Sequence, residues 1–156
     1  MALKINTPAP DFTVKNDKDE LISLSQYRGK WVVLYFYPKD NTSGCTKEAC
    51  DFNENLEQFN NIEAVIIGVS PDSVKSHQNF KKKYDLRFEL LSDTEKEVCN
   101  KYDVMGEKSM YGKKYLGVIR TTYIIDPEGT IRWVDPKVSV DGHANKIIEQ
   151  LAILQK

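Results

Sequence analysis

Two nearly continuous apolar runs constrain the fold of this chain more than any other feature: WVVLYFY at 31–37 and EAVIIGVS at 63–70. Both are rich in β-branched and aromatic residues, which suit a strand that is covered on both faces. The segment between them, 44–60, carries its apolar residues at helical spacing. This alternation of strand and helix predicts an α/β fold in which the two runs are central strands of a layered sheet.

Shorter runs of similar composition predict three more strands, at 88–92, 121–126 and 130–134. The sequence DPEG at 126–129 predicts a hairpin turn, which would make the last two of these strands antiparallel. The predicted fold class is therefore α/β with a mixed central β-sheet flanked by α-helices.

Helical spacing predicts three further helices, at 72–84, at 94–104 and at the C-terminus. In the last of them an apolar stripe is formed by Ile147, Ile148, Leu151 and Leu154. The longest irregular stretch is 105–120, and a stretch of that length is expected to have a functional role.

The composition is that of one compact domain. A chain of 156 residues with 40% hydrophobic residues fits a single domain over residues 1–156. Its 22 basic and 23 acidic residues leave a formal net charge of −1, so no global field attracts nucleic acid or an anionic membrane surface. No apolar run approaches the roughly 18 residues of a spanning helix, and the first residues lack an apolar signal segment. We expect a soluble, cytoplasmic protein without nucleic acid or membrane partners.

The three cysteines direct attention to reactive thiols, because an odd number without dense spacing suits a reducing compartment. Two of them lie in YFYPKDNTSGCTKEAC, which joins a strand to a helix through a loop. Cys45 falls in or just before the first helical turn, where unpaired N–H groups and the helix dipole stabilise a thiolate. Cys45 is therefore predicted to be nucleophilic at neutral pH. The alternative for a lone cysteine is a small buried apolar side chain.

Cys50 follows five residues later, about 140° around an ideal helix from Cys45, so the two thiols do not share a face and form no preset metal pair. Ideal geometry separates their Cα atoms by roughly 8–9 Å, beyond the limit of about 7 Å for a disulfide without backbone movement. A disulfide between them would require the first helical turns to unwind. Core packing is the alternative role for Cys50. Cys99 is expected to pack within a helix, and His77 and His143 are expected at the surface.

The sequence PKDNTSGC spaces Pro38, Thr42 and Cys45 as in the active-site motif of peroxiredoxins, which this chain resembles. Peroxiredoxins are thiol peroxidases on a thioredoxin-like fold. Cys50 is similar to the resolving cysteine of the bacterioferritin comigratory protein subfamily, also called peroxiredoxin Q. The segment RTTYIID resembles the strand that carries the active-site arginine of the family, here Arg120. The resemblance covers nearly the whole chain.

The resemblance implies that the Cys45 thiolate attacks a peroxide and becomes a sulfenic acid, which Cys50 resolves as an intramolecular disulfide. Arg120 would donate to the thiolate and the peroxide, and Thr42 would accept from the peroxide while donating to the thiolate. Pro38 would shield the thiolate from water. Taken singly, Arg120 is interpreted as a surface arginine, Thr42 as a helix cap and Pro38 as a strand terminator.

The resemblance also implies the partners. The substrates would be hydrogen peroxide and organic hydroperoxides, and the reductant would be thioredoxin or a similar dithiol protein. No cofactor and no metal are implied. A monomer or weak homodimer is expected.

Ser43 and Glu48 lie close to Cys45 in the sequence. Ser43 stands where the subfamily commonly has proline, so Ser43 is a candidate for the helix cap. Glu48 lies one turn beyond Cys45 on the same face, where a carboxylate would disfavour a thiolate unless it were paired. Glu48 is therefore expected to contact a cation, with Arg120 as a candidate. A solvated charge on the helix face is the alternative.

Three other functions compete with a peroxidase. A thioredoxin-like dithiol carrier would need a C-x-x-C pair, which the sequence lacks. A copper-binding assembly factor on the same fold would use two cysteines and a downstream histidine as ligands, but the wider cysteine spacing and the absence of an export signal weigh against it. An inactive scaffold is disfavoured because Cys45, Thr42 and Arg120 are all present.

Overall fold

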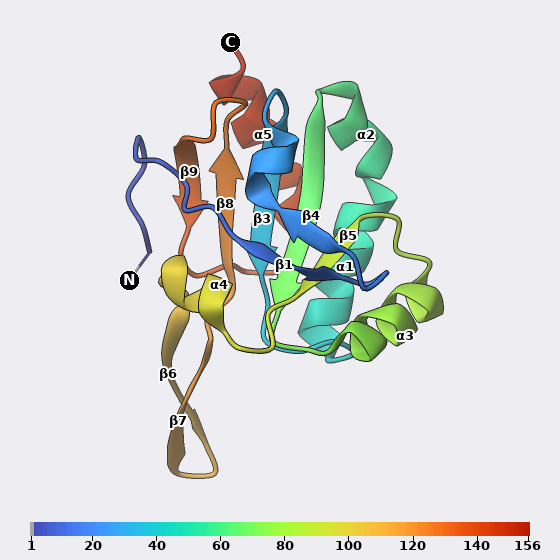
Figure 1. The fold of residues 1–156 in the computed structure, drawn as a ribbon, viewed down its shortest axis with the longest axis vertical. Helices are drawn as coiled ribbons and strands as arrows, with labels where there is room; N and C mark the ends of the chain where they lie inside the picture. Colours follow the sequence, from blue (N-terminus) through green and yellow to red (C-terminus); the bar gives the residue numbers. More distant parts are fainter. Residues whose placement is uncertain (1) are drawn as a thin grey trace.

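The central sheet has seven strands in the order β2-β1-β5-β4-β3-β8-β9 (Figure 1), in a computed structural model that describes residues 2–156. Strands β3, β4 and β5 run parallel to one another, and the other neighbours are antiparallel. The prediction of a mixed central sheet is thus confirmed. The strands are β1 (Thr13–Asn16), β2 (Leu21–Ser23), β3 (Trp31–Phe36), β4 (Ala64–Ser70), β5 (Glu89–Ser92), β8 (Thr121–Ile125) and β9 (Ile131–Asp135).

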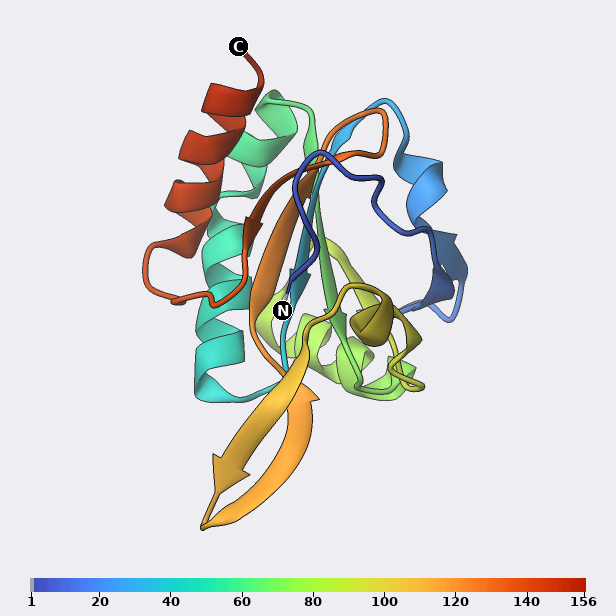
Figure 2. The ribbon, with the colours of Figure 1, turned by 90° about the vertical axis from the view of Figure 1, so that its left-hand side faces the viewer.

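Helices cover the sheet on both sides. Figure 2 shows α1, α2 and α5 against one face, with α4 and the short 3-10 helix η1 on the opposite side. Among the described residues no helix is both long and apolar enough to cross a membrane. The helices are η1 (Leu24–Tyr27), α1 (Ser43–Glu54), α2 (Leu56–Asn61), α3 (Val74–Tyr84), α4 (Glu97–Lys101) and α5 (His143–Leu154).

Alternate side chains of β3 supply the two apolar cores. Val33 and Tyr35 belong to a cluster with residues of α1, α2, α3 and α5, whereas Val32 and Leu34 belong to a second cluster with residues of η1 and α4. Successive strand residues point to opposite faces, so a strand between two layers must be apolar throughout. This explains why the run at 31–37 consists of aliphatic and aromatic residues. The strand ends at the carboxyl edge of the sheet, where the loop to α1 begins.

The single helix predicted at 44–60 is wrong in one respect, because it divides at Asn55. Asn55 ends α1 with φ −102° and ψ 10°, and its side-chain Nδ2 donates to the carbonyl oxygen of Asp51 over 2.8 Å. The asparagine thereby satisfies a carbonyl group at the end of α1. The apolar spacing continues into α2, so periodicity alone did not reveal the break.

The stretch 105–120 was predicted to be irregular, and this is wrong: it contains the antiparallel hairpin of β6 (Met105–Met110) and β7 (Lys113–Val118). Both views show the hairpin projecting beyond the sheet and helices (Figures 1 and 2). Tyr111 and Gly112 at its tip have φ values of 52° and 78°, as in a two-residue type I′ turn. The sequence carries Tyr-Gly there instead of Asn-Gly, so the usual hairpin signal is weak.

The other differences lie at short elements. Strands β1 and β2 and helix η1 were not predicted, because each spans only three or four residues. The helix predicted at 94–104 is confined to α4, since Lys96 has a left-handed φ of 59° and the helix begins after it. The hairpin turn at 126–129 is confirmed, with the Gly129 N–H donating to the Asp126 carbonyl oxygen over 2.9 Å.

Candidate active site

The loop from β3 to α1 sets the start of the helix that carries two cysteines. Thr42 is the N-cap residue with extended backbone angles, yet its side chain makes no capping hydrogen bond. Its Oγ1 instead donates to the Lys39 carbonyl oxygen over 3.0 Å. The hydroxyl hydrogen is used within the loop, and the oxygen keeps lone pairs that can accept from a ligand. Ser43 was a candidate for the helix cap, but it is the first residue of α1, and Thr42 occupies the N-cap position.

Cys45 is the third residue of α1, as the sequence predicted. Its thiol is free and the residue is 1% exposed, within the cluster that contains Tyr35 and Ala49. Burial of this kind suits an apolar cysteine equally well. The charges around the first turn of α1 must therefore distinguish the two interpretations.

Arg120 provides a positive charge at the first turn of α1. Its Nη1 lies 3.3 Å from Oε1 of Glu48. The guanidinium group also lies over Gly44, since a β-carbon at that position would be only 2.7 Å from Nη2. Glycine is thus the residue that lets an arginine approach the helix backbone this closely. The expectation that Glu48 contacts a cation, with Arg120 as the candidate, is confirmed.

Burial disfavours the charged form of Glu48 more than the contact with Arg120 favours it. Burial raises the pKa of Glu48 to about 8, and Arg120 only partly opposes this shift. Its second oxygen, Oε2, has no hydrogen-bond partner among the described residues, and neither has the hydroxyl of Tyr35. Burial, and after it the charge of Glu48, raises the pKa of Tyr35 well above its ordinary value. Near neutral pH the carboxyl group is therefore largely protonated, and its repulsion of a nearby anion is weak.

A cleft of about 510 Å³ opens above this turn, between the loop and the β6–β7 hairpin. It brings together three residues singled out from the sequence, Pro38, Thr42 and Arg120, whereas the buried Cys45 is not among the residues that line it. Burial and the neighbouring Arg120 lower the pKa of Lys108, whereas Cys45 raises it. The remaining lining residues are Lys39, Pro71, Lys96, Met105, Met110, Tyr115, Gly117 and Val118.

Cys50 lies on a different face of α1, as predicted. It is a free thiol at intermediate exposure, in a separate pocket of about 240 Å³ that is also lined by Val140 and Gly142 of the segment before α5. Burial, and after it Glu54, raises the pKa of Cys50. The structure therefore does not bring Cys50 to the cleft that contains Thr42 and Arg120.

Residues beside Cys50 hold the start of α5. Oδ2 of Asp51 accepts a hydrogen bond from the N–H of Ala144 over 3.0 Å. Lys47, one turn earlier in α1, pairs with Asp141. The first turn of α5 is thus attached to α1 through side chains that flank Cys50.

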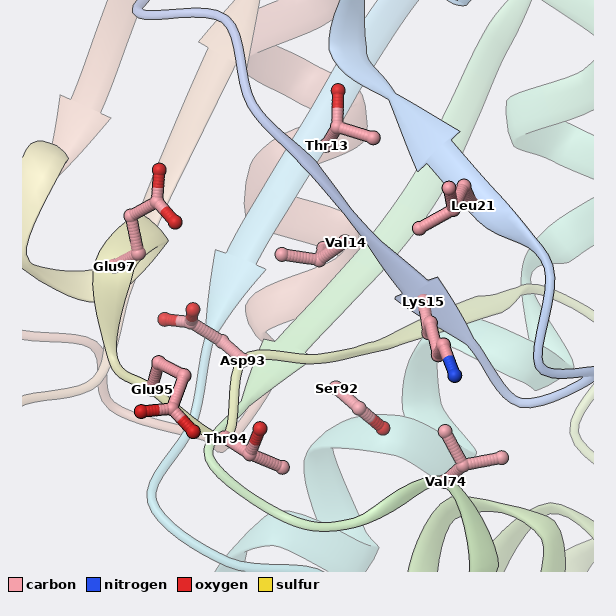
Figure 3. Close-up of a pocket in the computed structure, with 10 residues that line it drawn as sticks. All are labelled: Thr13, Val14, Lys15, Leu21, Val74, Ser92, Asp93, Thr94, Glu95 and Glu97. Carbon is pink, nitrogen blue, oxygen red and sulfur yellow. The ribbon is translucent and has the colours of Figure 1, made fainter.

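Cys99 packs within a helix, as predicted, and is 0% exposed. Its N–H donates to Oδ2 of Asp93 over 2.8 Å, and burial together with this carboxylate raises its pKa. Figure 3 shows Asp93 and Glu97 beside a further pocket of about 260 Å³, between β1 and the start of α4. None of the residues that line this pocket is a cysteine.

The expectation of surface histidines is wrong, because His77 is 0% exposed and His143 is 1% exposed. The imidazole of His143 shares a hydrogen bond of 2.9 Å with the Thr122 hydroxyl, and burial lowers its pKa to about 4. His77 contacts Asp40. Its position three residues before the buried Phe80 in α3 was a signal in the sequence, since residues at that spacing share a helix face. Neither contact joins a histidine to Cys45 or Cys50 as the copper-binding alternative requires.

The chain is similar to known proteins in both sequence and structure. The family model described as the AhpC/TSA family matches residues 5–134. A Coxiella burnetii protein provisionally named peroxiredoxin bcp is 50% identical over 151 residues, covering 97% of this chain and 100% of that protein. Peroxiredoxin Bcp of Bacillus subtilis is 46% identical over 151 residues, covering 97% and 96%.

A similar solved structure is that of the Xanthomonas campestris bacterioferritin comigratory protein, described for its alkyl peroxide reduction activity. It is 40% identical and superimposes with a TM-score of 0.92, covering 98% of this chain and 100% of that one.

Proposed function

The chain belongs to the AhpC/TSA family and has the thioredoxin-like fold of its peroxiredoxin relatives, and from this membership we propose a thiol peroxidase that uses Cys45 and Cys50 in turn. One observation supports the choice of site above the others. The side chains of Pro38, Thr42 and Arg120, which come from two distant segments, line one cleft above the helix turn that contains Cys45.

In the first step the Cys45 thiolate attacks one oxygen of a hydroperoxide and the O–O bond breaks. Cys45 becomes a sulfenic acid, and the other oxygen leaves as hydroxide or alkoxide and takes a proton. Negative charge develops on both oxygens. Arg120, held by Glu48, supplies fixed donors for that charge, and Thr42 accepts from the peroxide hydrogen.

In the second step the Cys50 thiolate attacks the sulfur of the Cys45 sulfenic acid. The hydroxyl group takes a proton and leaves as water, and a Cys45–Cys50 disulfide forms. The two thiols lie on different faces of α1, so this bond requires α1 to unwind around 44–51. A dithiol protein of the thioredoxin type then reduces the disulfide.

The cleft favours organic hydroperoxides as substrates besides hydrogen peroxide. Its lining includes the apolar side chains of Met105, Met110, Tyr115 and Val118, all from the hairpin. Apolar lining gives no advantage to hydrogen peroxide, which is small and polar, but contacts an alkyl group well. The alkyl peroxide reduction described for the Xanthomonas campestris relative supports this substrate class.

The test is peroxide consumption coupled to thioredoxin, thioredoxin reductase and NADPH, with hydrogen peroxide compared against a bulky organic hydroperoxide. We expect turnover with both. Cys50→Ser should complete one fast turnover, stop as the Cys45 sulfenic acid and form no intramolecular disulfide. Failure of the wild-type protein to consume either peroxide would refute the proposal. Unimpaired cycling of Cys50→Ser would instead assign the second step to Cys99 or to an external thiol.

A further inference from the structure

A buried polar cluster lies beneath the loop that leads to Cys45, and the proposed reaction does not use it. Its centre is the contact of Asp40 with His77, whose side chains are 2% and 0% exposed. Oδ2 of Asp40 lies 2.7 Å from Nδ1 of His77. Asp40 belongs to the loop, and His77 belongs to the first half of α3. Two residues 37 positions apart therefore join the loop to a rigid helix.

The hydrogen bonds of His77 determine where its protons are. Nε2 lies 2.9 Å from the carbonyl oxygen of Leu91, which can only accept, so Nε2 carries a hydrogen. Nδ1 faces a carboxyl oxygen of Asp40. One further proton must lie between these two atoms, because two lone pairs would otherwise face each other without water. The pair thus holds one proton more than a neutral histidine with a carboxylate.

Two hydroxyl groups also donate to the Asp40 carboxyl group. Tyr37 donates its hydroxyl hydrogen to Oδ1 over 2.6 Å, and Ser76 donates its hydroxyl hydrogen to Oδ2 over 2.8 Å. Burial raises the pKa of Tyr37 well above its ordinary value, so its oxygen keeps the hydrogen. A carboxyl group that accepts from several donors is stabilised in its charged form. The Asp40 carboxyl group is therefore held by three side chains, those of Tyr37, Ser76 and His77.

Asp72, in the short segment between β4 and α3, completes the cluster. Its Oδ2 accepts from the Asp40 N–H over 2.8 Å and from the Ser70 hydroxyl over 2.7 Å. Ligand atoms of Asp40, Asp72 and His77 lie within 4.8 Å of one another, close enough for a metal ion. Each of them already has hydrogen-bond partners, so the hydrogen bonds account for the cluster without a metal.

The cluster fixes the loop on the side that precedes Thr42. Asp40 is held by its N–H and by both carboxyl oxygens, and Asn41 follows in a left-handed conformation with φ 62°. Thr42 then donates to the carbonyl oxygen of Lys39, on the other side of Asp40, and its own carbonyl oxygen accepts the first α1 hydrogen bond, from Thr46. The location of the Thr42 hydroxyl therefore depends on Asp40.

We propose that Asp40 and His77 are positioning residues for peroxide reduction: their buried hydrogen bond holds the loop so that the Thr42 hydroxyl faces the cleft above Cys45. The inference rests on the proposed peroxidase function and adds two residues that touch neither peroxide nor thiolate. The two residues act on the site through the position of the loop and not through their own charge.

The test compares Asp40→Ala with Asp40→Asn by stopped-flow measurement of Cys45 oxidation by hydrogen peroxide, without a reductant. Asp40→Ala removes the anchor, and we expect the second-order rate constant to fall, by up to about a hundredfold for a shift near 1 Å. Asp40→Asn keeps an acceptor for Tyr37 and can donate its amide hydrogen to a neutral His77. It should restore the rate to near the wild-type value.

Nuclear magnetic resonance of the histidine nitrogens supplies a readout that a merely structural role would not change. In the wild-type protein Nδ1 of His77 should share a proton with Asp40, whereas in Asp40→Asn it should only accept from the amide. Asp126→Asn is the matched control, because Asp126 is also a loop carboxylate that accepts backbone N–H groups, at Glu128 and Thr130. It should leave the rate unchanged.

The outcomes separate the two ideas. If the wild-type Cys45 does not react with peroxide, the proposed function fails. If the wild-type protein reacts but Asp40→Ala reacts equally fast, or Asp40→Asn is as slow as Asp40→Ala, the positioning role fails. The absence of a proton shared between Nδ1 of His77 and Asp40 in the wild-type protein would overturn the proposed contact.

Discussion

Cys45 and Cys99 occupy equivalent places in two different helices. Each is the third residue of its helix, in α1 and α4, and each is almost completely buried, at 1% and 0% exposed. A helix N-terminus stabilises a thiolate through its free N–H groups and its dipole. Position alone would therefore assign the same reactivity to both thiols.

The side chains closest to the two helix starts carry opposite charges: a carboxylate at α4 and a guanidinium group at α1. At α4 the carboxylate of Asp93 accepts from the N–H groups of Val98 and Cys99 over 3.1 and 2.8 Å, and it raises the pKa of the Cys99 thiol beside it. At α1 no side chain caps the helix, and Arg120 lies over the first turn. We therefore expect a helix start to activate a cysteine only where its N–H groups are not already used by a carboxylate.

The largest effect is expected from exchanging each cysteine for serine. Cys45→Ser should abolish peroxide reduction, because a serine hydroxyl is almost wholly protonated at neutral pH and is then a weak nucleophile. Cys99→Ser should leave peroxide turnover nearly intact. The thioredoxin-coupled assay measures both. Residual turnover in the first variant or a severe loss in the second would break the contrast between the two helix starts.

Removing the cation at α1 is the next largest change. Arg120→Ala should slow the reaction of Cys45 with peroxide about a hundred- to a thousandfold, since loss of one preorganised donor to developing oxyanion charge costs roughly 2.7–4 kcal/mol. Stopped-flow oxidation of the reduced protein gives the rate constant, and circular dichroism checks the fold. An unchanged rate constant in a folded variant would remove Arg120 from the site.

Removing the carboxylate at α4 should make Cys99 more like Cys45. Asp93→Asn keeps an acceptor for the first N–H groups of α4 but deletes the charge beside the thiol. The pKa of Cys99 should fall, and its alkylation at a fixed alkaline pH should accelerate about tenfold for each unit of that fall. The pKa should stay above its ordinary value, because burial, the larger cause, remains. Alkylation as slow as in the wild-type protein would mean that burial alone controls this thiol.

Glu48 offers a smaller test, through the pH dependence of stability. Its pKa is raised from 4.5 to about 8 in the folded protein, so between these values the folded state holds a proton that the unfolded state has lost. The stability due to this group is complete below about pH 4.5 and is lost as the pH rises towards 8, by at most about 1.4 kcal/mol per pH unit.

Glu48→Gln imitates the protonated acid and should lack this dependence. Urea unfolding of both proteins from pH 5 to 9 measures it. Relative to the variant, the wild-type protein should lose stability as the pH rises, and the difference should become constant above about pH 8. A difference that does not change with pH would show that Glu48 is ionised throughout, and a charged carboxylate would then stand beside the α1 cysteine.

Features that depend on a local pattern could be predicted from the sequence. Contacts between residues far apart in the sequence could not. The strands at 31–37 and 63–70 and the place of Cys45 follow from apolar runs and from the loop that precedes α1. The buried contact of Asp40 with His77 requires the loop after β3 to lie against α3, which no local pattern shows. The contact of Glu48 with Arg120 was expected because the family resemblance placed Arg120 at the same site.

The β6–β7 hairpin was missed for a different reason. Met110, Tyr111, Tyr115 and Leu116 are exposed apolar residues, so the hairpin does not alternate between a buried and a solvated face. Alternation of that kind is what identifies a strand in a sequence. Its turn uses a tyrosine with positive φ, which few residues other than glycine, asparagine and aspartate adopt.

The attachment of α5 to α1 gives the proposed cycle an optical signal. Asp51, next to Cys50, holds the N–H of Ala144, and in the same first turn of α5 the Lys146 ammonium lies 5.7 Å from the centre of the Trp133 ring. Lys146 also pairs with Asp135 of β9 over 3.2 Å, so the Asp51 contact is one of two restraints near the indole. If the proposed disulfide forms and α1 unwinds, this turn loses the Asp51 anchor and the surroundings of the indole should change. Oxidation and reduction should then appear as opposite changes in tryptophan emission, and a Trp31→Phe background assigns them to Trp133. The chain would report its own redox state in a fluorimeter without an attached dye.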